Sequence, residues 1–61
     1  MYQIGWYYKD GRHFHDEYTY HDKAEAMLGM CSAGMESCVK DAYVMDAETG
    51  EILAELKLWP R

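Results

Sequence analysis

Two segments of alternating apolar and polar residues flank the dipeptide Asp10-Gly11, and this pattern limits the possible folds more than any other feature of the chain. Alternation with a period of two is typical of a strand with one buried face, and Asp-Gly between two such segments is a strong signal for a β-hairpin. A three-residue loop of Lys9, Asp10 and Gly11, with Gly11 in the left-handed region, pairs Trp6 with Phe14. This register gathers the following residues on one face: Tyr2, Ile4, Trp6, Phe14, Tyr18 and Tyr20.

The same register pairs Ile4 with Asp16 and Tyr2 with Tyr18. It places Asp16 on an otherwise apolar face, so we expect Asp16 to lie at a sheet edge or to find a polar partner. A two-residue loop of Asp10 and Gly11 would instead put the aromatic side chains of the second strand opposite the face of Trp6, and a slip of one residue would scatter the apolar set. The three-residue loop is therefore preferred.

A helix is predicted from Asp22 to Gly34, because Asp22 is a good N-cap and Glu25 follows it three positions later. Gly34 is the expected terminator. At helical spacing the apolar side chains form two rows, which would let most of the helix surface be buried: Ala24, Leu28, Cys31 and Met35 in one row, and Met27, Met30 and Gly34 in the next.

A second hairpin is predicted from strands at 39–46 and 51–59, joined by Ala47-Glu48-Thr49-Gly50. With the last three of these residues as the loop and Gly50 in the left-handed region, Val44 faces Ala54 and Ala42 faces Leu56. One face then carries Ala42, Val44, Ile52, Ala54, Leu56 and Leu58, which match the helix as a core.

The order hairpin, helix, hairpin predicts one α+β domain over residues 1–61, with a four-stranded, mainly antiparallel sheet and one helix on one face (ββαββ). Sixty-one residues are too few for two cores. The longest run without a charged residue, 26–35, contains two glycines and a serine, so no membrane-spanning helix is expected. The start of the chain lacks the pattern of a signal peptide, and we expect a cytoplasmic protein.

Eleven acidic against six basic residues give a net charge of −5. Direct binding of nucleic acid needs clustered Lys and Arg, so this balance argues against it and favours partners with a basic surface. The same charge also serves solubility, which is the simpler explanation for it.

One helix covers only one face of such a sheet, so the residues of the other face are informative. Tyr7, Tyr43, Met45, Leu53 and Trp59 are more apolar than a solvated face needs, and an apolar patch rimmed by charge usually marks a protein contact. We therefore expect either a foreign partner or a second copy of the chain on this face. Aromatic side chains that pack only on one another are the simpler alternative.

Four acidic residues follow the third predicted strand and its turn: Asp41, Asp46, Glu48 and Glu51. If that strand lies at a sheet edge, they form an acidic rim that imitates a row of phosphates and occupies the basic groove of a nucleic-acid-binding protein. Charge that protects an edge strand from aggregation is the alternative explanation.

His13 and His15 share a strand face with Glu17, which suggests a metal site, but neighbours on one strand stand about 7 Å apart and converge poorly on one ion. Cys31 and Cys38 match no metal or redox spacing and are expected to be thiols, with Cys31 as a small core residue. The sequence has no catalytic motif. We therefore expect no cofactor, no metal and no enzymatic activity.

In size, acidity and element order the chain resembles the small inhibitor proteins that bacteriophages encode, anti-CRISPR proteins among them. The resemblance rests on Asp10-Gly11, the helix signals at 22–34 and Thr49-Gly50-Glu51, and it transfers no residue roles. It implies a protein that binds a basic nucleic-acid channel of a host complex or blocks a conformational step in it.

We therefore expect a non-enzymatic inhibitor of a host nucleic-acid-handling complex, acting on a protein or nucleoprotein surface through these residues: Tyr7, Asp41, Tyr43, Asp46, Glu48, Glu51 and Trp59. A structural or regulatory homodimer that uses the uncovered apolar face is the first alternative. A metal-responsive module based on His13 and His15 is the second.

Overall fold

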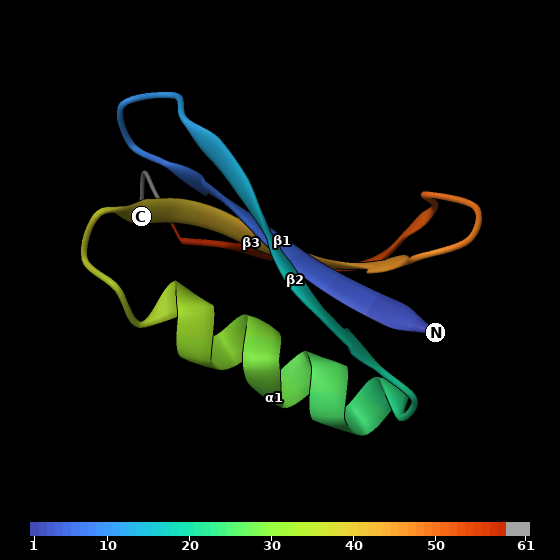
Figure 1. Ribbon diagram of the computed structural model, residues 1–61. Helices are drawn as coiled ribbons and strands as arrows, with labels where there is room; N and C mark the ends of the chain where they lie inside the picture. The colour runs from blue at the N-terminus through green and yellow to red at the C-terminus, as the bar shows by residue number, and fades with distance from the viewer. Residues whose placement is uncertain (59–61) are drawn as a thin grey trace.

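The computed structural model describes residues 1–58, and it has the predicted order of elements. The strands are β1 (Tyr2–Tyr8), β2 (His13–Tyr20), β3 (Val39–Asp46) and β4 (Ile52–Lys57), and the helix is α1 (Lys23–Gly34). All strand pairs are antiparallel, and the sheet order is β2-β1-β3-β4. Figure 1 shows α1 lying against one face of this sheet, which confirms the α+β prediction.

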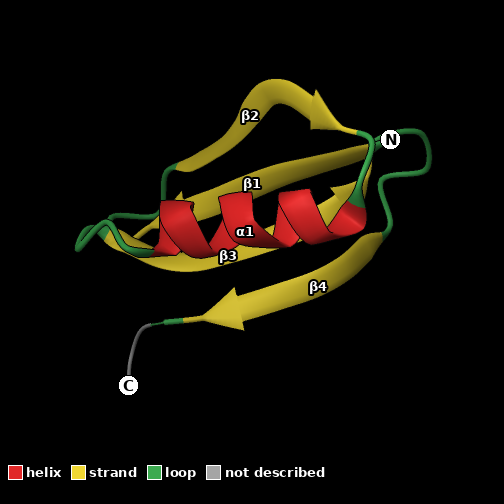
Figure 2. Cartoon of the chain, turned by 90° about the horizontal axis from the view of Figure 1, so that it is seen from below, coloured by secondary structure: helices red, strands yellow, loops and turns green. Residues whose placement is uncertain are grey.

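The pairing of β1 with β3 places both strands inside the sheet and leaves β2 and β4 at its edges. Figure 2, seen from the helix side, shows α1 lying over β1 and β3. The core forms at this crossing, from residues with at most 4% exposure: Ile4, Ala26, Met30, Ala42 and Val44. No helix of residues 1–58 is long and apolar enough to span a membrane.

The first hairpin has the predicted loop. Gly11 has a φ of 95°, the Tyr8 N–H donates to the Arg12 carbonyl at 2.8 Å, and Trp6 pairs with Phe14. Further from the loop the prediction is wrong, because Tyr2 pairs with Tyr20 and not with Tyr18. β2 has two more residues than β1 between these pairs, and this bulge makes the strand arch away from β1 (Figure 2).

Asp16 lies in this bulge. Both expectations for it are confirmed, since it lies at a sheet edge and has a polar partner. β2 is an edge strand, and the Asp16 carboxylate accepts the N–H of Tyr18 at 3.0 Å. The Gln3 amide spans the bulge and donates to the Asp16 carbonyl at 2.8 Å. Tyr18 is displaced outward by the arch and is 66% exposed, whereas Tyr20 packs against the core.

α1 begins as predicted, since the Asp22 carboxylate accepts the Ala24 N–H at 2.9 Å. The helix ends at Gly34, but Gly34 lacks the positive φ of a left-handed terminator, and Met35 in the αR region is the C-cap. Of the two predicted apolar rows, the row that contains Leu28 and Met35 is wrong, since these residues are 70% and 86% exposed. Met30 of the other row is buried as predicted, and the helix also buries Ala26, which belongs to neither row.

In the second hairpin Gly50 has a φ of 76°, and Val44 faces Ala54 while Ala42 faces Leu56, as predicted. The loop is one residue longer than expected. It runs from Ala47 to Gly50, because the backbone N–H of Asp46 donates to the Glu51 carbonyl. A bulge in β4, between the pair Met45–Ile52 and the pair Val44–Ala54, restores the predicted register from Val44 onward. Ile52, predicted for the core face, therefore pairs with Met45 and is 44% exposed.

Candidate functional site

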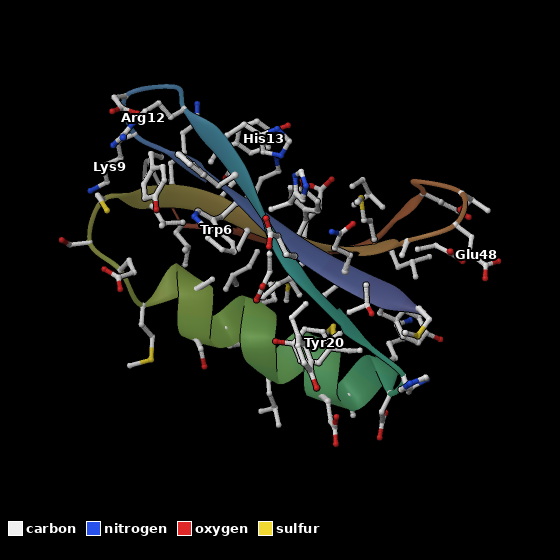
Figure 3. The ribbon with its side chains drawn as sticks, in the orientation of Figure 1. Trp6, Lys9, Arg12, His13, Tyr20 and Glu48 are labelled. Carbon is white, nitrogen blue, oxygen red and sulfur yellow. The ribbon has the colours of Figure 1, made fainter. Side chains whose placement is uncertain are left out.

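The sheet face that α1 leaves uncovered carries a group of aromatic rings that crosses three strands. Figure 3 shows His13 on this side of the sheet and Trp6 on the side of the helix. Tyr7 and His13 are directly paired across β1 and β2, and Tyr43 of β3 pairs with Gly5 of β1. We call Tyr7, His13 and Tyr43 the aromatic cluster.

The rings of the aromatic cluster are held by stacking and by one hydrogen bond. Tyr7 and His13 stack with their centroids 4.3 Å apart and their planes 13° apart. The Tyr43 hydroxyl and His13 Nε2 share a hydrogen bond of 2.5 Å. The ring centroids of Tyr7 and Tyr43 lie 6.1 Å apart, and those of His13 and His15 lie 6.5 Å apart. These contacts link β3 to β2 across the intervening strand.

Tyr43 reaches across β1 because Gly5 has no side chain. A Cβ at Gly5 would overlap the phenol ring and its hydroxyl. Tyr43 as a whole residue is thus only 7% exposed, although no helix covers it. Burial raises the pKa of Tyr43, and the neighbouring Tyr7 raises this pKa further.

A small hollow of about 140 Å³ lies beside the cluster between β1, β3 and β4. Its walls include three predicted site residues, Tyr7, Asp41 and Tyr43, together with Ile52, Glu55 and Lys57. Lys57 pairs with Asp41 across the strands and lies 3.7 Å from the Glu55 carboxylate, in a largely exposed ion pair. Two carboxylates and one ammonium leave this hollow with a local charge of −1.

The predicted acidic rim is not formed. It required β3 to lie at a sheet edge, whereas β3 lies inside the sheet. Asp41 and Asp46 are five positions apart on β3, which separates them by about 17 Å along the strand. Glu48 and Glu51 are exposed in the loop of the second hairpin, and Figure 3 shows Glu48 at the opposite end of the sheet from Lys9 and Arg12. The four acids therefore form no single row.

Asp46 has a structural role in that loop. Its Oδ1 accepts the N–H of Glu48 at 2.8 Å and the N–H of Thr49 at 3.4 Å. This arrangement is an Asx-turn, which orders the loop from its first residue. Trp59, the remaining predicted site residue, lies outside the described residues.

The structure thus brings together Tyr7, Asp41 and Tyr43 and separates them from the acidic loop. The structure adds His13 to the site, whereas the sequence pattern suggests it only as a metal ligand. A signal for it was available, since the preferred hairpin register already pairs His13 with Tyr7. The role of Ile52 could not be found in this way, because it depends on the bulge in β4.

Among residues 1–58, no three His, Cys, Asp or Glu side chains are grouped as metal ligands would be. The Nε2 atom of His13 is already bonded to Tyr43. Cys31 and Cys38 are both free thiols, and Cys31 is exposed, so its predicted place in the core is wrong.

Comparison of the chain with protein-family models, curated proteins and solved structures gives no match.

Proposed function

We propose that this protein is a non-enzymatic binding domain that captures a protein or nucleoprotein partner with a basic surface through the uncovered sheet face. The observation that carries the proposal is the aromatic cluster, in which an exposed Tyr7 is fixed by His13 and Tyr43 beside the carboxylates of Asp41 and Glu55. Tyrosine is enriched among the residues that dominate protein interfaces.

The fixed rings favour binding for an energetic reason. Ordering a flexible side chain at an interface costs about 0.5–1.5 kcal/mol. The stack on His13 already orders Tyr7 in the free protein, while its side chain remains accessible to a partner, with 37% of the residue exposed. Ile52, 44% exposed at the hollow, adds apolar area next to it.

The charge of the chain supports the choice of partner. A net charge of −5 attracts basic surfaces and repels nucleic acid itself. Together with the size and element order, it leads us to propose an inhibitor of a host nucleic-acid-handling complex, of the kind that bacteriophages encode. The CRISPR interference complex is one such target.

The proposal is tested in bacteria that carry an active CRISPR interference system, by measuring plaques of a phage that this system targets. Production of the protein is expected to restore plaques, and Tyr7→Ala is expected to abolish the effect because it removes the exposed ring. Leu28→Ala is the matched control, since it truncates an exposed apolar side chain of α1. Absence of restored plaques across the CRISPR types tested would refute this target, and equal activity of Tyr7→Ala would refute the binding face.

A homodimer through the same face is the second candidate, favoured by the adjacent exposure of Tyr7 and Ile52. Association would bury apolar surface that a 61-residue domain has little means to cover alone. Sedimentation equilibrium separates the two candidates. A dimer that Ile52→Glu converts to a monomer would support self-association, and a monomer at all concentrations would refute it.

A further inference from the structure

A groove of about 450 Å³ lies on the other side of the sheet, between α1 and the arch of β2. We call it the helix-side groove. Its floor is formed by Ile4, Trp6 and Tyr8 of β1, and Gly29 and Ala33 line it from the helix. The groove exists because the bulge in β2 carries that strand away from β1 (Figure 2).

Two carboxylates stand at this apolar floor, Asp16 from the arch of β2 and Glu36 from the segment after α1. Within residues 1–58 the ion pairs are Arg12 with Asp10 and Lys57 with Glu55, so neither groove carboxylate has a cationic partner there. Asp16 is bonded to a backbone N–H of its own strand. The groove therefore combines aromatic and aliphatic surface with two carboxylates that form no ion pair within residues 1–58.

The rim of the groove already shows how its aromatic residues interact with a guanidinium. The Arg12 guanidinium lies over the Tyr8 ring, 4.9 Å from its centroid, and the Arg12 Nε is 2.8 Å from the Asp10 carboxylate. Aromatic face and carboxylate together are the surroundings that a guanidinium prefers. Trp6, which offers the stronger cation–π surface, is only half-buried.

We propose that the helix-side groove binds an arginine side chain of a basic protein partner. The aliphatic stem lies on Ile4 and Ala33, the guanidinium plane stacks on Trp6, and its N–H groups donate to Asp16 and Glu36. A planar fork of donors fits two separated carboxylates and an aromatic face better than the compact ammonium of lysine. This site lies on the opposite side of the sheet from the aromatic cluster, so the inference does not rest on the proposed function.

The test uses the full chain, isotope-labelled for NMR, and three acetylated and amidated tripeptides: Gly-Arg-Gly, Gly-Lys-Gly and Gly-citrulline-Gly. Citrulline has the shape of arginine without the charge. The arginine peptide is expected to shift the resonances of Trp6, Gly29 and Ala33, and citrulline is expected to bind at least about tenfold more weakly, since it loses two charge-assisted bonds.

The variant Asp16→Asn with Glu36→Gln removes both charges and keeps an Oδ1 acceptor for the Tyr18 N–H. It is expected to retain a folded spectrum and to lose at least about tenfold in affinity for the arginine peptide. Glu48→Gln with Glu51→Gln is the matched control, because it removes two exposed charges from the loop of the second hairpin and leaves the groove intact.

Three results would overturn the inference. They are shifts confined to Tyr7 and His13, equal binding of the citrulline peptide, and unchanged affinity of the double variant. Binding of the lysine peptide as tight as that of the arginine peptide would overturn the assignment to arginine. Loss of plaque restoration in Tyr7→Ala with intact binding of the arginine peptide would separate this site from the proposed binding face.

Discussion

The phenol ring of Tyr43 occupies the space that a side chain of Gly5 would fill. The two residues are direct partners across β1 and β3. With the ring laid over this glycine, the Tyr43 hydroxyl reaches His13 on β2, one strand further away. The ring thereby covers the backbone of β1 at this position. Here it also orders the aromatic cluster.

Gly5→Ala is expected to destabilise the protein by about 1–3 kcal/mol, because the added methyl group displaces a packed ring. The same change should release the hydrogen bond between Tyr43 and His13. Urea unfolding followed by tryptophan fluorescence measures the free energy, and ring resonances of His13 report the local change.

The double variant Gly5→Ala with Tyr43→Ala is the control for this mechanism. In a protein that already lacks the Tyr43 ring, Gly5→Ala should cost almost nothing, since the clash has been removed. Strictly additive costs of the two substitutions would show that the glycine is needed for a different reason.

Tyr43→Phe isolates the hydrogen bond from the packing of the ring. Loss of the bond to His13 is expected to cost about 0.5–1.5 kcal/mol and to increase the mobility of the His13 ring. The fold should persist, because the phenyl ring still covers Gly5. Chemical unfolding gives the cost, and no measurable cost would mean that water replaces the bond without penalty.

Asp46 is expected to be a turn residue, so its substitutions should act through loop order. Asp46→Asn keeps an oxygen acceptor for the N–H groups of Glu48 and Thr49 and should leave stability nearly unchanged. Asp46→Ala removes the acceptor and should cost about 1 kcal/mol. Thermal unfolding of the two variants makes the comparison. An equal cost for both would point to the charge of Asp46 instead of the turn.

The sequence predicted the order of elements and the pairs nearest the turn of the first hairpin, because those depend on local signals. In the second hairpin it predicted the pairs Val44–Ala54 and Ala42–Leu56 but not those beside the turn. Gly11 and Gly50 both have the expected positive φ, and Trp6 faces Phe14 as the loop length requires. The bulge in β2 was missed, since the bond from Gln3 to Asp16 that spans it joins residues distant in sequence. The bulge in β4 was missed as well.

The candidate site was predicted only in part for the same reason. No local signal in β3 indicates that it pairs with β1. This pairing decides where the predicted site residues Tyr43 and Asp41 lie. It places Tyr43 over Gly5 and beside Tyr7, and it removes Asp41 from a sheet edge. Alternation alone could assign these residues to a face but could not say which of them meet.

The helix offers a direct comparison of the predicted and observed core. Met30→Ala is expected to cost about 2–5 kcal/mol, because it leaves a cavity between α1 and the sheet. Leu28→Ala, on the opposite side of the helix, should change stability by no more than about 0.5 kcal/mol. Both residues were predicted to be buried, since both rows of α1 are apolar. A large cost for Leu28→Ala in monomeric protein would restore the original prediction.

Alkaline unfolding should depend on two tyrosines. Burial raises the pKa of Tyr43 and of Tyr20, with contributions from Tyr7 for Tyr43 and from the Asp16 carboxylate among others for Tyr20. The folded state then keeps these protons at a pH where the unfolded chain releases them. Their contribution to stability is therefore complete below about pH 10, the unfolded value, and is lost as the pH rises through the folded value.

The free energy of unfolding is thus expected to fall more steeply above about pH 10 in the wild type than in Tyr43→Phe, which has one such proton fewer. Urea unfolding at a series of alkaline pH values measures the slopes, and tyrosinate absorbance follows the ionisation. Leu28→Ala is the control, because it removes no titrating group and should run parallel to the wild type. Parallel curves for Tyr43→Phe and the wild type would mean that the Tyr43 hydroxyl ionises in the folded protein as readily as in the unfolded chain.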